Sequence, residues 1–315
     1  MIALDEIEAA RDRLAGAIVR TPLVRLELED APAELYLKLE NLQPIGSFKL
    51  RGAGNALALA SPEELERGVW TASAGNMAQG VAWWARRLRL QCTCVVPDTA
   101  PETKLAAIRR LGSEIVQVSF GGWWEVFRTR AYEGLEGRFV HAFSDPAVMA
   151  GNGTIGLEVV DDLPDVDAVV IPYGGGGLTC GIASALRELR PQCRIFAAEV
   201  ATGAPLAPSL EAGRPTRVDY EPSFVDGIGS PEVFPEMFEL TRELVGGSLV
   251  VDVEKVADAV RLLAERARVV AEGAGAAALA AALTGNAGEG KIVCIVSGGN
   301  IDASKLSAIL AGELP

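Results

Sequence analysis

The segment Gly46-Ser47-Phe48-Lys49 contains the residue best suited to chemistry, a lysine placed between an apolar strand and a helix. We expect the strand over residues 35–39 and the helix over 48–60, with Ser47 as N-cap because its hydroxyl can accept from a first-turn N–H. The positive end of the helix dipole favours the neutral form of an amine placed there. A neutral lysine can form a Schiff base with a carbonyl compound. Lys49 is therefore the candidate catalytic residue, although from position alone a surface lysine is the commoner case.

Four glycine- or serine-rich segments stand where ligands gather in α/β proteins. In parallel sheets, ligands bind beyond the carboxyl ends of the strands. The segments are residues 73–76, 174–177, 272–275 and 297–300. Residues 73–76 open a helix and can bind a carboxylate through backbone N–H groups, whereas the side-chain-free residues 174–177 suit a phosphate. Each segment alone is more often a turn, but the four together with Lys49 predict a ligand site.

The apolar pattern predicts strands and helices that alternate along the chain. The strands are short, apolar and rich in β-branched residues, which is typical of a mostly parallel, buried sheet. The predicted strands are residues 35–39, 69–71, 93–96, 115–118, 139–142, 168–171, 195–200 and 292–296. The predicted helices are residues 7–18, 48–60, 77–88, 101–111, 147–161, 178–189, 234–244, 256–268 and 274–283.

The composition excludes several classes of function. The 315 residues carry a net charge of −13, with 29 basic and 42 acidic residues, which argues against a nucleic-acid partner or an anionic membrane surface. No signal peptide and no run of 18 apolar residues is present. Five cysteines without framework spacing suit a reducing cytosol. Cys92 and Cys94 share one strand face and are expected in the core, and the single His141 leaves little for histidine-based sites.

Two glycine patterns imitate nucleotide-binding motifs. Residues 151–156 match G-x-G-x-x-G, but a helix start precedes them instead of a strand, and residues 170–177 contain no acid for a ribose. Residues 174–177 lack the Lys-Ser/Thr pair of a P-loop. Neither a dinucleotide nor a nucleoside triphosphate is expected.

Taken together, the motifs resemble those of the threonine/serine dehydratase family of pyridoxal phosphate enzymes, which have the tryptophan-synthase-β type of fold (fold type II). The resemblance covers residues 15–302. It rests on Glu40-Asn41-Leu42-Gln43 with Gly46-Ser47-Phe48-Lys49, and on residues 71–80, 174–177 and 297–300. It implies an α/β, two-domain enzyme with mostly parallel twisted sheets flanked by helices. A smaller domain of residues 53–143 would be inserted into a larger one of residues 1–52 and 144–315, with the cofactor between them.

The resemblance also implies roles for individual residues. Lys49 would form a Schiff base with pyridoxal 5′-phosphate and later move the Cα proton of the substrate. Residues 174–177 would hold the phosphate, Asn76 would bond the ring 3′ oxygen, and Ser297 would face the pyridine nitrogen. The predicted cofactor-binding residues are Phe48, Lys49, Asn76, Gly174, Gly175, Gly176, Gly177, Leu178, Glu272, Ser297 and Gly298. The predicted substrate-binding residues are Ser73, Ala74, Gly75, Asn76 and Met77.

The implied reaction is α,β-elimination of water from a 3-hydroxy amino acid such as threonine or serine, which gives a 2-oxo acid and ammonia. A neutral hydroxyl at Ser297 makes the ring a weaker electron sink than a carboxylate would, which favours prompt loss of the β-hydroxyl. Alternatives are racemisation or β-replacement at the same lysine, and a binding protein that has lost the chemistry, against which the intact Lys49 speaks. The expected protein is a cytoplasmic homodimer that binds a small amino acid and neither nucleic acid nor membrane.

The chain departs from the family pattern in several places. Met77 stands where many members have histidine, so a bulkier substrate such as phenylserine is a further alternative. Trp123 and Trp124 either pack in the core of the smaller domain or place one indole in the cleft.

Two further departures concern metal binding and regulation. Glu199 fits a cation ligand of some members, but Pro205 falls where their aspartate would be, so no metal is predicted. Biosynthetic threonine deaminases carry a C-terminal regulatory domain, which is absent here, so isoleucine is not expected to inhibit.

Overall fold

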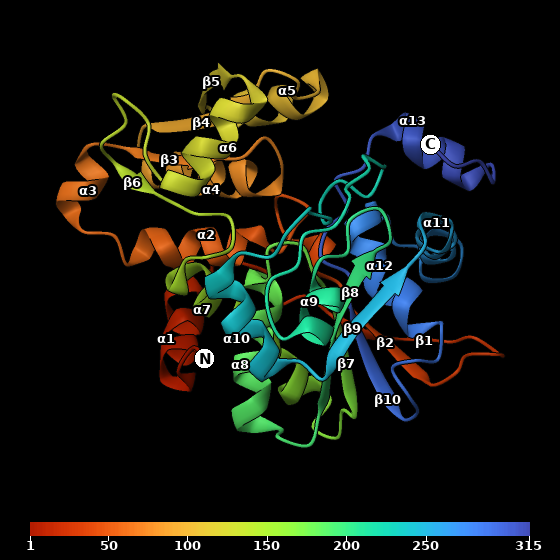
Figure 1. Cartoon of the computed structure of the whole chain (residues 1–315). Helices are drawn as coiled ribbons and strands as arrows, with labels where there is room; N and C mark the ends of the chain where they lie inside the picture. The colour runs from red at the N-terminus through yellow and green to blue at the C-terminus, as the bar shows by residue number, and fades with distance from the viewer.

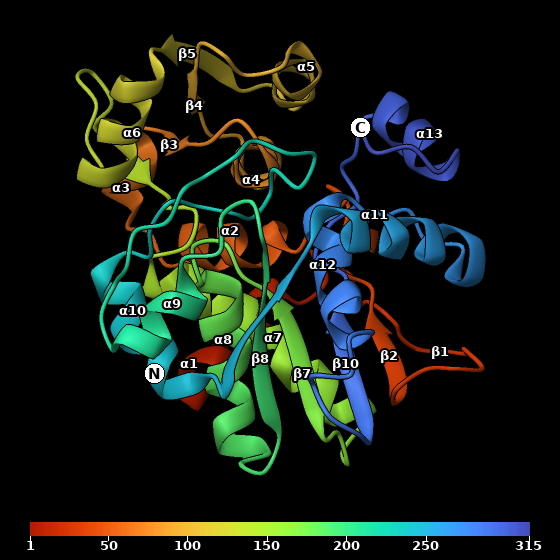
Figure 2. The same ribbon diagram turned by 45° about the vertical axis from the view of Figure 1, so that its right-hand side comes forward.

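The chain forms two twisted sheets, each flanked by helices, in a computed structural model that describes all 315 residues. The larger sheet has six strands in the order β1-β2-β10-β7-β8-β9, and the smaller has four in the order β5-β4-β3-β6. All pairs are parallel except β1 with β2. Figures 1 and 2 show the smaller sheet at the top of the molecule, the larger sheet at the bottom and α2 between them.

The two sheets use different parts of the chain. The larger sheet contains β1 (Leu23–Leu26), β2 (Glu34–Lys38), β7 (Ala168–Pro172), β8 (Arg194–Val200), β9 (Gly247–Val251) and β10 (Lys291–Ile295). The smaller contains β3 (Val69–Ala72), β4 (Cys92–Pro97), β5 (Glu114–Val118) and β6 (Arg138–Phe139). All strands of the smaller sheet therefore lie inside the range predicted for the smaller domain, whose boundaries stay a prediction.

Thirteen α-helices connect or cover the strands. They are α1 (Leu4–Leu14), α2 (Lys49–Ala58), α3 (Pro62–Glu66), α4 (Asn76–Leu88), α5 (Glu102–Arg110), α6 (Phe120–Thr129), α7 (Pro146–Asp162), α8 (Gly177–Leu189), α9 (Leu206–Ala212), α10 (Pro235–Leu244), α11 (Val253–Leu262), α12 (Gly273–Ala282) and α13 (Ala303–Leu310). A 3₁₀ turn, η1 (Glu40–Leu42), follows β2, and a π-helical turn, η2 (Leu263–Ala267), extends α11.

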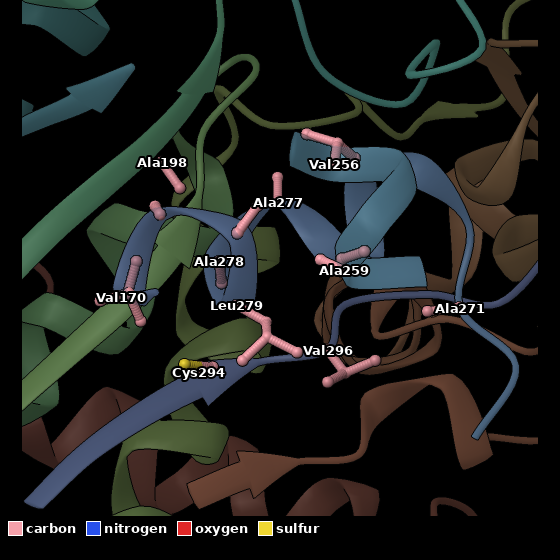
Figure 3. Close-up of a cluster of buried hydrophobic side chains, with 14 of the residues drawn as sticks. Val170, Ala198, Val256, Ala259, Ala271, Ala277, Ala278, Leu279, Cys294 and Val296 are labelled. Carbon is pink, nitrogen blue, oxygen red and sulfur yellow. The ribbon is translucent and has the colours of Figure 1, made fainter. Parts of the chain in front are cut away.

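The core of the larger sheet shows why the strands are apolar throughout. Both faces of β7 and β10 are covered by helices, so every residue of β7 is buried. On one face, Ala277, Ala278 and Leu279 of α12 pack with Val170 of β7 and Cys294 of β10 (Figure 3). The small alanine side chains let this helix lie close to the sheet.

Several predicted boundaries are wrong. Helix 7–18 ends at Leu14, since Gly16, a poor helix residue, follows soon after. Strand 139–142 is reduced to β6, because the chain turns at residues 142–144. The predicted helix 256–268 begins three residues earlier and becomes π-helical at Leu263. Six elements were not predicted, namely β1, β9, α3, α6, α9 and α13; β9 is a half-exposed edge strand that begins with glycine and therefore has the pattern of a loop.

The segment that imitates a dinucleotide motif, residues 151–156, lies in the interior of α7. Its glycines serve helix packing: a Cβ on Gly153 would lie 2.9 Å from the carbonyl oxygen of Gly181 in α8. The structure therefore explains this motif by close contact between α7 and α8. The chain has no helix that is both long and apolar enough to cross a membrane.

Candidate functional site

Lys49 is the first residue of α2, directly after the turn that follows β2. Its Nζ donates a hydrogen bond to the carbonyl oxygen of Ala142 at 2.7 Å and lies 4.9 Å from the centre of the Phe48 ring. Burial lowers the pKa of the Lys49 amine to about 8, and the nearby Glu272 carboxylate acts in the opposite direction. The sequence predicts reduced basicity of Lys49 from the helix dipole, whereas in the structure burial is the main cause of the lowered pKa.

The turn before Lys49 is tied to the end of β10. Phe48 and not Ser47 occupies the N-cap position, so the predicted helix start is wrong by one residue. The Ser47 hydroxyl nevertheless accepts from the Lys49 N–H at 3.3 Å. The Phe48 N–H donates to the carbonyl oxygen of Ser297 at 3.0 Å, and Ser47 forms a β-bridge with Gly298. These contacts place Ser297 and Gly298 beside the lysine.

The glycine loop (residues 174–177) joins β7 to α8 and ends in the first turn of that helix. Side chains are excluded there because Phe143 packs underneath. A Cβ on Gly175 would lie 2.0 Å from the Phe143 ring, and one on Gly177 would lie 2.6 Å from the Phe143 carbonyl oxygen. The first N–H groups of α8, which include those of Gly177 and Leu178, have no intrahelical partner. Such a cradle fits a phosphate.

Asn76 and Glu272 connect the two sheets at the same site. Asn76 Nδ2 donates to Glu272 Oε1 at 2.8 Å, and Asn300 Nδ2 donates to Asn76 Oδ1 at 2.7 Å. Asn76 begins α4 of the smaller sheet, whereas Glu272 precedes α12 of the larger sheet. The structure therefore brings Asn76 and Glu272 together from segments 196 residues apart in sequence.

The segment 73–76 forms a tight turn before α4. Ser73 Oγ accepts from the Gly75 N–H at 3.2 Å, and a Cβ on Gly75 would meet no atom within 4 Å. Open space therefore lies beside this backbone, next to a helix N-terminus, as a carboxylate site requires. The Met77 side chain behaves differently, since it is 1% exposed and packs in the core of the smaller sheet with Ala74 at its edge. Its contact with a substrate stays a prediction.

Trp123 and Trp124 pack in an aromatic cluster of the smaller sheet. Their rings stack on Phe127 at centroid distances of 5.4 and 5.8 Å. Phe127 in turn lies 5.4 Å from Phe143, the residue beneath the glycine loop. This arrangement matches the core alternative for both indoles, and Phe143 is the member of the cluster that reaches the predicted site.

A buried cluster of charged residues, which the sequence analysis missed, anchors the helix that carries Lys49. Arg51 Nε and Nη2 each donate to the Glu40 carboxylate at 2.8 Å, and Arg51 Nη1 donates to Glu158 at 2.7 Å. Lys38 forms an ion pair with Glu158 at 2.6 Å. Burial opposes the charge of Arg51, but Glu40 and Glu158 outweigh it and raise the pKa of the guanidinium. The cluster joins β2, α2 and α7.

Both carboxylate oxygens of Glu199, the residue that matched a cation ligand, already accept hydrogen bonds from groups within the chain. Its carboxylate accepts from the N–H groups of Leu206 and Ala207 at 2.8 and 2.9 Å and from the Ser248 hydroxyl at 2.6 Å. Burial raises its pKa. No group of three or more His, Cys, Asp or Glu side chains is arranged to hold a metal ion.

Replacing Glu272 with glutamine is expected to change how stability depends on pH. Burial raises the pKa of Glu272 to about 7 from 4.5, although the Asn76 hydrogen bond opposes this shift. Between these values the folded chain binds more protons than the unfolded chain, so Glu272 lowers the unfolding free energy as pH rises. Urea titrations of cofactor-free protein across this window should show wild type losing stability relative to Glu272→Gln. If the unfolding free energies of wild type and Glu272→Gln change with pH in parallel, the assigned pKa is contradicted.

Comparisons with known proteins agree with this arrangement. The family described as pyridoxal-phosphate dependent enzyme matches residues 14–298. The L-threonine ammonia-lyase of Thermotoga maritima is 42% identical over 98% of this chain and 78% of its own length. The catabolic L-threonine dehydratase of Escherichia coli K12 is 38% identical over 98% of this chain and 96% of its own.

Solved structures give the same result. The processed form of threonine deaminase isoform 2 from Solanum lycopersicum superposes with a TM-score of 0.86 at 33% identity and covers 98% of this chain and 87% of its own. Maize serine racemase superposes with a TM-score of 0.89 at 31% identity and covers 99% of this chain and 98% of its own. These findings confirm the predicted resemblance, the fold class and pyridoxal phosphate as the cofactor. The individual site residues stay predictions.

Proposed function

Since the chain belongs to the family of pyridoxal-phosphate-dependent enzymes, we propose that it is an ammonia-lyase that removes water from L-threonine or L-serine. The enamine that remains after the loss of water would tautomerise and be hydrolysed, so the products are a 2-oxo acid and ammonia. One observation carries the proposal: a lysine with a pKa of about 8 is held by Ala142, beside a glycine-lined helix N-terminus and a polar pair that joins both sheets. The similar L-threonine ammonia-lyase and dehydratase sequences support the reaction class.

The chain contains groups suited to each part of the cofactor. The N–H groups of the glycine loop and of Leu178 would hold the phosphate, because they are the unpaired donors at the start of α8. Asn76, fixed by Glu272, would bind the ring oxygen with its amide. Ser297 would offer its hydroxyl to the pyridine nitrogen, and the Phe48 ring lies beside the Lys49 amine.

The proton transfer falls to Lys49. When bound, pyridoxal phosphate supplies a carbonyl for the amino group and a ring that withdraws electrons from Cα. The Nζ of Lys49 would accept the Cα proton, since a pKa of about 8 leaves roughly a tenth of the amine neutral at pH 7, far more than the ordinary lysine value allows. Residues 73–76 would orient the substrate by binding its carboxylate through the backbone N–H groups before α4. The protonated lysine would then give that proton to the β-hydroxyl, which departs as water.

An assay of 2-oxo acid release from a panel of 3-hydroxy amino acids tests the proposal directly. We expect 2-oxo acid and ammonia in equal amounts from L-threonine and L-serine. A phenyl group in place of the threonine methyl should be disfavoured if Met77 faces the core, as its 1% exposure indicates. Phe143 is the member of the aromatic cluster that reaches the site. If its ring lines the pocket, the bulkier substrate should be favoured instead. Comparison of kcat/KM for threonine and 3-phenylserine decides between these two expectations. Absence of 2-oxo acid from every substrate would contradict the proposed reaction.

A second candidate activity is serine racemisation, which the resemblance to maize serine racemase favours. Racemisation requires a group that delivers a proton to the face of Cα opposite Lys49. The assay is chiral chromatography of serine after incubation with L-serine. D-Serine formed faster than pyruvate would assign the chain to racemisation, and pyruvate formed faster would assign it to elimination.

We further propose a cytoplasmic homodimer. All five cysteines are buried and unpaired, which suits a reducing compartment. Sedimentation equilibrium of the purified protein should give twice the mass of one chain, and a single-chain mass at micromolar concentration would contradict the dimer.

A further inference from the structure

His141, the only histidine, lies directly behind the site. Its side chain is 2% exposed and is surrounded by aromatic rings, with Phe127 and Phe143 at centroid distances of 4.5 and 4.7 Å. The mechanism proposed above assigns it no role. A buried aromatic position of this kind would usually be explained by packing alone, but the hydrogen bonds of the ring indicate more.

One ring nitrogen organises the turn that follows. His141 Nδ1 accepts from the N–H groups of Phe143 at 3.2 Å and Ser144 at 2.9 Å. It also lies 3.1 Å from Ser144 Oγ, which accepts from Arg130 at 2.9 Å and is therefore free to donate its own proton to the ring. Because Nδ1 accepts from backbone N–H groups, the neutral imidazole must carry its proton on Nε2.

The other nitrogen argues against a purely packing role. His141 Nε2 is buried without a hydrogen bond of good geometry, with only the backbone of Phe127 close enough to favour a proton on the ring, and a buried donor without a well-formed hydrogen bond carries a free-energy penalty. A phenylalanine would fill the same aromatic surroundings without that penalty. The useful atom of the imidazole is therefore Nδ1, the acceptor.

The surroundings of His141 keep its imidazole neutral, so that Nδ1 remains a hydrogen-bond acceptor. Burial lowers the pKa of His141 to about 3, and the cations of Arg130 and Lys49 act in the same direction. Protonation would place a second donor opposite the N–H groups of Phe143 and Ser144 and break the turn.

The turn that His141 holds has two contacts with the site. The carbonyl oxygen of Ala142 accepts from Lys49 Nζ at 2.7 Å, and Phe143 packs beneath the glycine loop, where its ring and carbonyl exclude any Cβ on Gly175 or Gly177. We propose that His141 is a positioning residue, which fixes the turn at residues 142–144 and thereby places the carbonyl that orients Lys49 and the ring that shapes the phosphate cradle. This inference rests on the proposed roles of Lys49 and the glycine loop.

Two substitutions of His141 distinguish the effect of its hydrogen-bond acceptor from the effect of its aromatic ring. In His141→Asn, Oδ1 stands at the same number of bonds from the backbone as Nδ1 and can accept the same N–H groups, but the ring is lost. In His141→Phe the ring is kept and the acceptor is lost. If His141 only fills space, phenylalanine should replace it better than asparagine does. If it positions the turn, the order should be reversed.

The measured quantity is the dissociation constant of pyridoxal phosphate from the protein. It is obtained by adding the cofactor to cofactor-free protein and monitoring the quenching of tryptophan fluorescence. We expect the dissociation constant of His141→Asn to stay within about threefold of wild type and that of His141→Phe to rise by about tenfold or more, the size expected when buried N–H groups lose their acceptor. If His141→Phe does not fold, His141→Gln replaces it, because its acceptor is one bond farther out and should also weaken binding.

Two results would overturn the inference. One is His141→Phe, or in its place His141→Gln, binding the cofactor as tightly as His141→Asn does. The other is a borohydride label on a lysine other than Lys49 in the wild-type holoenzyme, which removes the proposed function as well. Equal affinities of the variants with the label on Lys49 overturn the role of His141 alone.

Discussion

Lys49→Ala is expected to reduce turnover of L-threonine by at least about 100-fold, the smallest loss typical for removal of a general acid/base. The loss should be larger than this limit, because Lys49 is assigned two tasks, attachment of the cofactor and transfer of the Cα proton. Its amine is suited to both, with a pKa of about 8 and a fixed partner in the Ala142 carbonyl. The measurement is kcat for 2-oxo acid release, with thermal unfolding to verify the fold.

Lys255→Ala is the matched control, since Lys255 is an exposed lysine on α11. Its activity should equal that of wild type. Lys38 is unsuitable as a control because it is fully buried in an ion pair with Glu158. Wild-type kcat in Lys49→Ala would remove Lys49 from the mechanism.

Arg51→Met is expected to lower the unfolding free energy by about 3–5 kcal/mol, the usual result of removing one partner from a buried ion pair. The guanidinium of Arg51 satisfies Glu40 and Glu158 together, and both carboxylates are buried. Without it, two buried carboxylates would face each other with Lys38 as the nearest cation. Urea unfolding of the cofactor-free protein at neutral pH measures the loss.

The pH dependence of the same variant gives a second check. Burial would raise the pKa of Glu40, but Arg51 outweighs burial and lowers it. Glu40 therefore contributes stability above its unfolded pKa that is lost as pH falls through the folded value. In Arg51→Met the sign should reverse, because a buried carboxylate without a cation prefers its proton and gains stability as pH falls.

Arg25→Met is the control for Arg51. The Arg25 side chain is 50% exposed and pairs with Glu27 at 3.2 Å, so its loss should change stability by no more than about 1 kcal/mol. A loss for Arg51→Met as small as that of the control would contradict the anchoring role of the buried cluster.

The sequence was sufficient for the fold class, and it also predicted a ligand site, since both depend on local patterns. Lys49, the glycine loop and Ser297 follow strands at one edge of the larger sheet, so their proximity follows from parallel topology. The sequence indicates that Asn76 and Glu272 lie near the same site, but it does not predict the hydrogen bond between their side chains. Side-chain contacts between the two sheets depend on their relative placement, which no local pattern specifies.

The supporting residues were harder to recognise. Arg51 and Glu158 are 107 residues apart, and charged residues are usually exposed, so no periodicity distinguishes them from surface residues. Glu40 was part of a quoted motif, but its burial was not apparent. His141 was noted only as a single histidine. Its proposed role depends on the turn at residues 142–144, whose first residue falls in the predicted strand 139–142.

The central claim is that Lys49 carries the cofactor. The most direct test is borohydride reduction of the purified holoenzyme, followed by proteolysis and mass spectrometry of the lysine-containing peptides. We expect a single phosphopyridoxyl group on Lys49 and none on Lys38, Lys104, Lys255, Lys291 or Lys305. A label on any of those five lysines, with Lys49 unmodified, would contradict it.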